Sequence, residues 1–470
     1  MLKARPSNSS KPPDPAHHRR LLAGLALLGI ISLVCLLVLI PAAVRALPGR
    51  YAARLPGFVQ NLRRQPHPGL LPTPAIDITP AALFTLAPTK LHLGGVTFVT
   101  PTPVESRALE PTRSPAYQPA STLSRPTGEP TSSPIPATHT PTQRPTSTPV
   151  PLPARASLPP FTHTYQTWNN CGPATLSMAL SYFHQTETQA DAAAFLKPDP
   201  EDKNVSPYEM AVYARSLELE ATVRVGGDLT RLKQLIAAGL PVVVETWFIP
   251  EPGDQMGHYR LLTSYDDEAR QFTAHDSYNG PNVLLDYDAF DELWRVFNRV
   301  YLVVYQPFQA GQLAAILGDD VDRHHAYASA LETAQAEAAN PNAECVAYEA
   351  CTDGAAFAWF NIGSNLTALG RHQEAAAAYD QARLLGLPWR MLWYQFGPYE
   401  SYHAVERYDD VVTLATVTLN ITDNLEESHY WRGMALLAQG ETDKARDDFK
   451  AALKYNPNLD VASRALESLQ

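Results

Sequence analysis

The chain has 470 residues, enough for two or three domains, and most of its 42 prolines fall in the first third. Its formal net charge of −11 argues against a general nucleic-acid-binding protein, because phosphate contacts need basic patches. The sequence has no CxxC pair, no HExxH motif and no glycine-rich phosphate loop, so we expect neither a metal nor a nucleotide cofactor.

The first predicted element is a transmembrane helix at residues 21–44, preceded by a cytoplasmic tail at 1–20. The run has no charged residue and is long enough to cross a hydrocarbon core of about 30 Å. A signal peptide cleaved after Ala46 is the alternative, but the run exceeds the ~7–15 apolar residues typical of signal sequences. Basic residues flank both ends equally, and Arg19 and Arg20 abut the span. We expect a single-pass membrane protein with its C-terminal domains outside the cytoplasm.

Residues 45–160 form a predicted stalk rich in proline, serine and threonine. Such a composition cannot bury enough apolar area to offset the entropy of ordering, so we expect a disordered, extended segment. The stretch Lys90 to Val99 is an exception, because it alternates and turns at Gly94 and Gly95, which predicts a short hairpin.

Residues 161–307 read as an α+β domain, with helices followed by mainly antiparallel strands. Helices are predicted at 172–183, 188–195, 206–217 and 229–238, and strands at 241–248, 258–265, 271–278 and 299–307.

Residues 308–470 are helical and contain an internal repeat. The segments Trp359 to Ala382 and Tyr430 to Leu453 align, with a weaker copy between them. The aligned pairs are Gly363 with Gly433, Gly370 with Gly440, Ala375 with Ala445, and Tyr379 with Phe449. Their common spacing is about two periods of the ~34-residue tetratricopeptide repeat, which this all-α region resembles. Stacked repeats build a concave binding surface, so a protein partner is expected here.

Cys171 stands at the predicted start of a helix, in "NNCGPATLSMAL". A thiol is a nucleophile only as the thiolate, and a helix N-terminus lowers its pKa. Gly172 and Pro173 fit the entry of the helix. Acyl transfer also needs donors for the developing oxyanion; the backbone N–H of Cys171 and the side chain of Gln166 are the candidates.

His258 is the best candidate for the base, because it opens an apolar strand directly after a glycine. Asp276 lies in the next predicted strand. If the hairpin turns near Asp267, His258 is opposite or diagonal to Asp276 on one face of the sheet. Asp276 can then orient the imidazole toward Cys171, whereas the adjacent His275 points to the other face.

The stretch from Gln166 through Cys171-Gly172-Pro173-Ala174, then Gly257-His258-Tyr259, then Asp276, resembles the C39-like cysteine peptidases over residues 161–307. The resemblance implies a papain-like fold. It further implies Cys171 as nucleophile, His258 as general base, Asp276 as the orienting acid and Gln166 as the oxyanion donor. The best-known relatives are domains of peptide exporters, and this chain has no ATPase domain.

The sequence as a whole predicts an extracytoplasmic cysteine peptidase that hydrolyses a peptide or protein substrate. Two alternatives use the same parts: a Cys-dependent amidase or acyltransferase, and a non-catalytic binding scaffold. Cys345 and Cys351 can form a small disulfide loop outside the cytoplasm or remain free thiols inside it.

Overall fold

The computed structural model describes residues 70–74, 152–250, 254–340 and 354–469, and the backbone of two short strands, β1 (His92–Leu93) and β2 (Val96–Thr97). These two strands pair antiparallel in a separate unit, which confirms the predicted hairpin at Gly94 and Gly95. The predicted transmembrane helix at 21–44 lies outside the described residues, as do Cys345 and Cys351. Within the described ranges, no helix combines the length and apolar character needed to cross a membrane.

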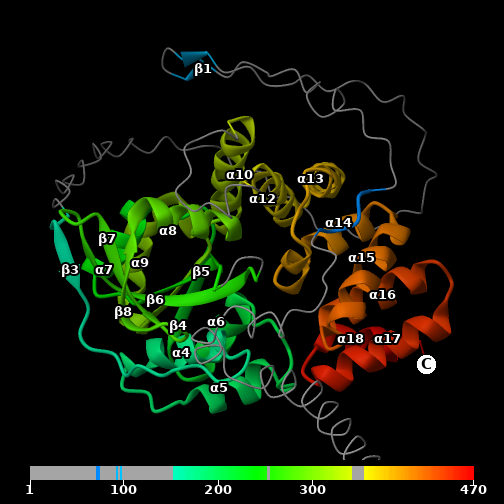
Figure 1. The fold of residues 1–470 in the computed structure, drawn as a ribbon, viewed down its shortest axis with the longest axis horizontal. Coiled ribbons are helices and arrows are strands. Elements are labelled where there is room, and N and C mark those ends of the chain that lie inside the picture. Colours follow the sequence, from blue (N-terminus) through cyan, green and yellow to red (C-terminus); the bar gives the residue numbers. More distant parts are fainter. Residues whose placement is uncertain are drawn as a thin grey trace, which may run out of the picture. The chain divides into compact units, whose positions relative to one another are not determined.

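An antiparallel seven-stranded sheet is the centre of the first folded region (Figure 1). Six strands follow the order β4-β9-β5-β6-β7-β8, and β3 pairs with the end of β6. Their bounds are β3 (Arg155–Ser157), β4 (Glu220–Arg224), β5 (Val242–Phe248), β6 (Met256–Asp266), β7 (Gln271–Asp276), β8 (Gly280–Asp286) and β9 (Tyr301–Tyr305). β3 falls in the range predicted as stalk, so the sheet begins before Phe161.

Helices cover both faces of this sheet because its central strands alternate between two cores. Val243, Leu261 and Leu302 belong to one core, and Val244, Leu262 and Val303 to the other. The first core contains α4 (Cys171–Ser181), α5 (Gln189–Leu196) and α6 (Pro207–Ser216). The second contains α7 (Leu229–Ala237), α8 (Tyr287–Trp294) and α9 (Ala310–Leu317). This is the α+β arrangement predicted.

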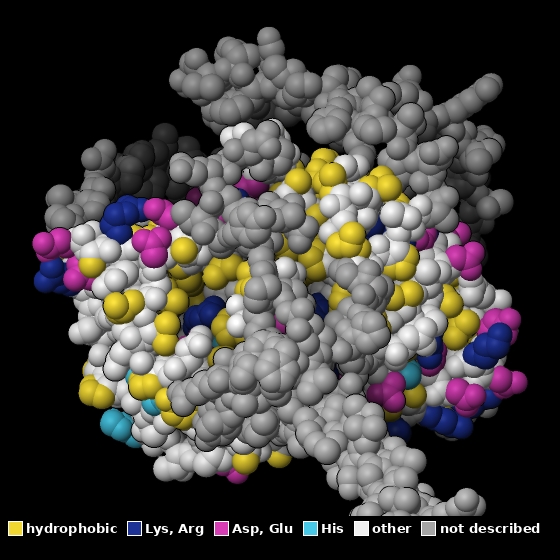
Figure 2. Space-filling model, in the orientation of Figure 1, with side chains coloured by type: hydrophobic (Ala, Val, Ile, Leu, Met, Phe, Trp, Pro, Cys, Tyr) yellow, Lys and Arg dark blue, Asp and Glu magenta, His cyan; other side chains and the backbone are white. Residues whose placement is uncertain are grey.

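The described part after β9 is helical, as predicted, with short 3-10 turns between some helices. The α-helices that follow α9 are α10 (Arg323–Ala339), α12 (Gly354–Ala368), α13 (His372–Leu384), α14 (Gly397–Ala404), α15 (Tyr408–Ile421), α16 (Glu426–Ala438), α17 (Thr442–Tyr455) and α18 (Asp460–Glu467). The 3-10 turns used below are η3 (Arg295–Phe297) and η6 (Trp389–Trp393). Charged side chains of both signs gather over α16 and α17 at the right of Figure 2.

The aligned residues of the repeat occupy equivalent places in two helix pairs. A Cβ on Gly363 would lie 2.5 Å from the Tyr379 ring, and one on Gly433 would lie 2.7 Å from the Phe449 ring. The two glycines therefore let the ring of the second helix pack directly on the first helix. Gly370 and Gly440 end the first helices with positive φ angles of 73° and 84°.

The sheet domain and the helical repeats share one hydrophobic core. Trp247 of β5 packs edge-on against Phe357 of α12, with ring centroids 5.5 Å apart. Asn298 and Asn365 exchange side-chain hydrogen bonds of 2.7 and 3.2 Å, and both are buried. Because these contacts are buried, the two regions fold against each other rather than as separate modules.

Candidate active site

Cys171 is the first residue of α4, a helix whose next nine residues are all buried. The first turn contains no acidic residue, and the side chain of Asn170 does not cap it. The positive end of the helix dipole therefore acts on the thiol, and the first turn of the helix adds no carboxylate that would oppose it. Gly172 allows close packing here, because a Cβ at that position would lie 3.2 Å from Val205.

The thiol of Cys171 interacts with the imidazole of His258, near the start of β6, closely enough that each group shifts the pKa of the other. On the other side of the ring, Nε2 lies 2.9 Å from Oδ1 of Asp276, at the end of β7. Nδ1 is then the nitrogen available to the thiol. The strand register explains the meeting: Arg260 pairs with Asp276, so His258 lies diagonally across from Asp276 on the same face.

Asp276 is fully buried and accepts hydrogen bonds from several donors besides His258. Arg260 donates through Nε at 2.9 Å, and the backbone N–H groups of Tyr278 and Asn279 each donate at 2.8 Å. Burial alone raises the pKa of this carboxyl, but His258 and Arg260 hold the pKa well below its ordinary value. Asp276 is therefore an anion of fixed orientation.

The imidazole of His258 is enclosed by aromatic rings. Phe248 stacks on it at 4.6 Å between centroids, and Tyr278 meets it edge-on at 6.5 Å. Burial lowers the pKa of His258, but Asp276 and the Cys171 thiol more than compensate, so the pKa lies above its ordinary value. The site thus favours the imidazolium.

The same electrostatics act on the Cys171 thiol in the opposite sense. Burial raises its pKa, but the hydrogen bond and charge of His258 lower it, as do the backbone of Tyr259 and the charge of Lys197. The result is a pKa below the ordinary 9.0. A lowered thiol pKa beside a raised imidazole pKa is the signature of a thiolate–imidazolium pair.

Gln166 lies beside the triad rather than in it. Its backbone N–H donates to the Ser277 carbonyl at 2.9 Å, and its side-chain oxygen accepts from Ser277 Oγ at 2.8 Å. Ser277 thereby holds the amide oxygen and turns the amide N–H₂ group away from itself. That group is a hydrogen-bond donor of the kind an oxyanion requires.

Three contributors were absent from the expectations based on sequence. Arg260 is a charged residue within an apolar strand, two positions after His258. This spacing puts it on the same face as His258 and could have marked it as a partner of Asp276. Ser277 directly follows Asp276, but nothing in the sequence connects it to Gln166. Lys197 is buried, and its role depends on chain folding that a linear pattern does not reveal.

His275 points away from the site, as predicted. Its ring lies 5.5 Å from that of His163 and 5.9 Å from that of Phe161, on the opposite face of β7. Burial and the charge of His163 lower the pKa of His275, which therefore favours the neutral form.

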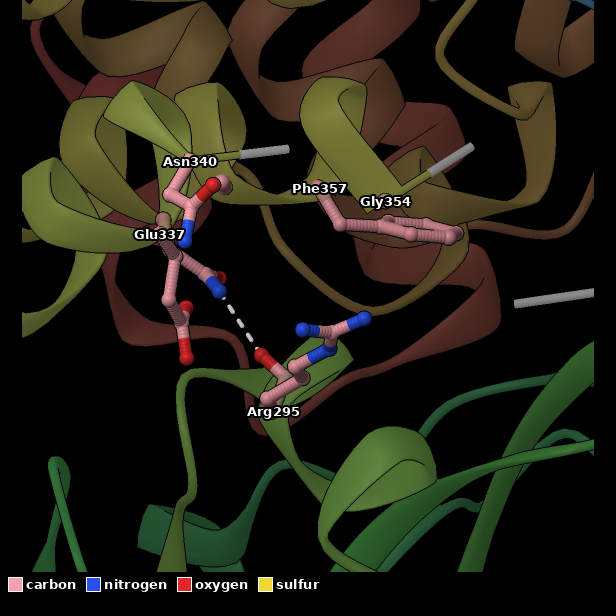
Figure 3. Close-up of a pocket in the computed structure, with 7 residues that line it drawn as sticks. Arg295, Glu337, Asn340, Gly354 and Phe357 are labelled. Carbon is pink, nitrogen blue, oxygen red and sulfur yellow. Dashed lines mark hydrogen bonds between the residues drawn. The ribbon is translucent and has the colours of Figure 1, made fainter. Parts of the chain in front are cut away.

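A separate pocket lies where α10 ends and α12 begins, beside η3 (Figure 3). Its lining includes Arg295, Glu337 and Phe357, and Asn361 donates to the Arg295 carbonyl at 2.7 Å. None of the predicted site residues lines it. Within the described ranges, no group of three or more His, Cys, Asp or Glu side chains is arranged to hold a metal ion.

The fold and the meeting of Cys171, His258 and Asp276 define a class: an α+β domain with a cysteine-peptidase-like fold, followed by helical repeats. Comparison with known families agrees with this class. Residues 150–303 match the Peptidase_C39 like family, and residues 358–382 and 426–459 match tetratricopeptide repeats. The chain therefore contains a Peptidase_C39-like domain followed by tetratricopeptide repeats. No curated protein matches the chain.

Proposed function

We propose that the protein is a cysteine peptidase that cleaves peptide bonds through Cys171, His258 and Asp276. The observation that carries the proposal is the meeting of three side chains: His258 is hydrogen-bonded to the buried Asp276 at 2.9 Å and acts on the Cys171 thiol at the start of α4. The charges around it favour the thiolate and the imidazolium together.

In this mechanism the Cys171 thiolate attacks the scissile carbonyl carbon, and a C–S bond forms. The oxyanion accepts hydrogen bonds from the backbone N–H of Cys171 and the amide N–H₂ of Gln166. The C–N bond breaks as His258 gives its proton to the leaving amine. Water then attacks the acyl-enzyme, His258 takes one proton from the water, and the acid product leaves with the thiolate restored.

The test uses the full chain and a defined mixture of unmodified peptides, with new termini read by mass spectrometry. Wild type is expected to generate cleaved peptides, and Cys171→Ala is expected to generate none. An added amine such as hydroxylamine separates hydrolysis from acyl transfer, because an acyltransferase yields mainly the hydroxamate. Cleavage that persists in Cys171→Ala contradicts the proposal, and an unreactive wild type would favour a non-catalytic scaffold.

The proposal extends to location and partners. The uncharged run at 21–44 supports a membrane anchor, with the peptidase and repeat regions outside the cytoplasm. The tetratricopeptide repeats support binding of a protein partner or substrate. Protease digestion of intact cells tests the topology: external domains are degraded, whereas cytoplasmic domains stay protected.

A further inference from the structure

We propose that the repeat domain is part of the active site. Tyr394 and Arg390 lie between α13 and α14 and hold the start of β6, so the position of His258 depends on the repeats. The inference rests on the proposed function, because it names positioning residues for the same Cys171–His258 couple.

Tyr394 contacts the residue that directly precedes His258. Burial raises the pKa of the Tyr394 hydroxyl, and the nearby backbone of Gly257 offsets part of that rise. A Cβ on Gly257 would lie 3.0 Å from the Tyr394 ring and 2.9 Å from Phe297. Gly257 therefore allows the ring from the repeats to lie directly on the β6 backbone. Tyr394 also packs edge-on against Phe297, with centroids 5.7 Å apart.

Arg390 binds the residues just before β6. Its Nη1 lies 2.6 Å from Oδ1 of Asp254 and donates to the Gln255 carbonyl at 2.8 Å. The guanidinium lies over Trp389 and Trp393, 5.4 and 5.1 Å from their ring centroids. These rings hold the guanidinium in place, since cation–π contacts restrict its rotation.

The repeats also reach the other segment beside Cys171. Asn424, just before α16, donates to Asp199 Oδ1 at 3.4 Å. That loop carries the buried Lys197, whose Nζ donates to the Asn169 carbonyl at 3.0 Å and to the Asp202 carbonyl at 2.9 Å. Thus the repeats contact both the loop beside the nucleophile and the strand that carries the base.

One consequence follows for the reaction. A protein that binds the repeats and moves η6 would also displace Gly257 and hence His258. The repeats then act on the chemistry directly, in addition to any role in recruitment.

The experiment measures iodoacetamide alkylation of Cys171 against pH in the full chain, with the Cys171 peptide quantified by mass spectrometry. The variants are Tyr394→Phe, which removes only the hydroxyl, and Arg390→Gln. Each is expected to slow alkylation at neutral pH about fivefold and to shift the thiol pKa upward, as loss of one polar contact predicts.

The matched controls are Tyr408→Phe at the start of α15 and Arg446→Gln on α17. Arg446 is bonded to Asp443 one turn away on the same helix. Both controls are expected to keep the wild-type profile, and thermal unfolding of every variant reports on folding. Wild-type profiles in both Tyr394→Phe and Arg390→Gln would overturn the inference. His258→Ala separates the two claims: a profile sensitive to His258 but not to Tyr394 or Arg390 leaves the proposed function standing and removes only this inference.

Discussion

The buried carboxylate of Asp276 accepts hydrogen bonds from two buried side chains. His258 and Arg260 bind its two oxygens, and both side chains are themselves buried. Removing one member of a buried ionic network leaves the other charges unpaired, which costs more than the lost bond itself. At this position the stability of the fold and the proposed chemistry depend on the same atoms.

Asp276→Ala is therefore expected to lower the free energy of unfolding by about 3–5 kcal/mol, because Arg260 would remain buried without its partner. By contrast, Cys171→Ala is expected to lower the free energy of unfolding by no more than about 1 kcal/mol, while it abolishes thiol reactivity. Urea titration of both variants measures the difference. Equal stability of the two would show that Asp276 is not the centre of a buried charge network.

The pH dependence of Asp276 follows from the sign of its shift. Its folded-state pKa lies below the ordinary 3.8, so its stabilising contribution is present above that value and is lost as pH falls further. Below about pH 4, the free energy of unfolding of wild type is thus expected to fall more steeply with decreasing pH than that of Asp276→Asn. Superimposable acid transitions for the two proteins would contradict this.

The pairing of His258 with Asp276 was predictable because side-chain alternation and turn position set the strand register. The role of Arg260 was not predicted, because an arginine stabilises a buried site only where a carboxylate faces it. Ser277 and Lys197 illustrate the limit more clearly. Their partners, Gln166 and the Asn169 carbonyl, are brought to them only by the tertiary fold.

At the scale of elements, the helices that begin with clear capping residues were predicted most closely. Thr188 and Ser206 form capping boxes with Asp191 and Glu209, and the predicted helices agree with α5 and α6 to within one residue at each end. β4, β8 and α8 were not predicted. β4 has only five residues, with glutamate and arginine at its ends, and it is stabilised by pairing with β9 much later in the chain.

The repeat helices give a test of close packing. Gly433→Ala is expected to destabilise the protein by about 1–3 kcal/mol, because the new methyl would lie 2.7 Å from the Phe449 ring. Gly311→Ala in α9 is the control, since a Cβ there meets nothing within 4 Å. That substitution is expected to stabilise by about 0.4–1 kcal/mol. Thermal unfolding measures both, and equal signs would refute the packing argument.

At the scale of the whole molecule, the shared core predicts that the Peptidase_C39-like region does not fold alone. A fragment ending at residue 307 would expose Trp247 and Phe297 and leave Asn298 without Asn365. We expect it to aggregate or to lack a cooperative unfolding transition, whereas a chain from residue 152 to 470 unfolds cooperatively. A soluble 152–307 fragment with a sharp thermal transition would contradict the shared core.

Carboxyl groups also lie where the sheet domain meets the repeats, among them Glu209 and Glu426. Burial raises the pKa of Glu209 to about 7, with a further contribution from Glu426 of the repeats. Because the folded-state pKa is raised above 4.5, its stabilising contribution is present below that value and is lost as pH rises through about 7.

In wild type, the free energy of unfolding is expected to fall by up to roughly 3 kcal/mol between pH 4.5 and 8 because of Glu209. Glu209→Gln is expected to remove this fall. Gln retains an acceptor for the Ser206 N–H, which Glu209 now binds at 2.8 Å. Urea unfolding at several pH values checks this. A variant whose stability falls with pH as steeply as wild type would place the titration elsewhere.

The Cys–His couple is tested most directly by the pH dependence of iodoacetamide alkylation at Cys171 in the full chain, with wild type measured beside His258→Ala. If the two side chains form a thiolate–imidazolium pair, the wild-type thiol pKa lies below the ordinary 9.0. Without His258, burial dominates and the pKa is expected to rise to or above that value. Slow alkylation that is the same with and without His258 would contradict the Cys–His couple and leave a protein that binds without catalysing.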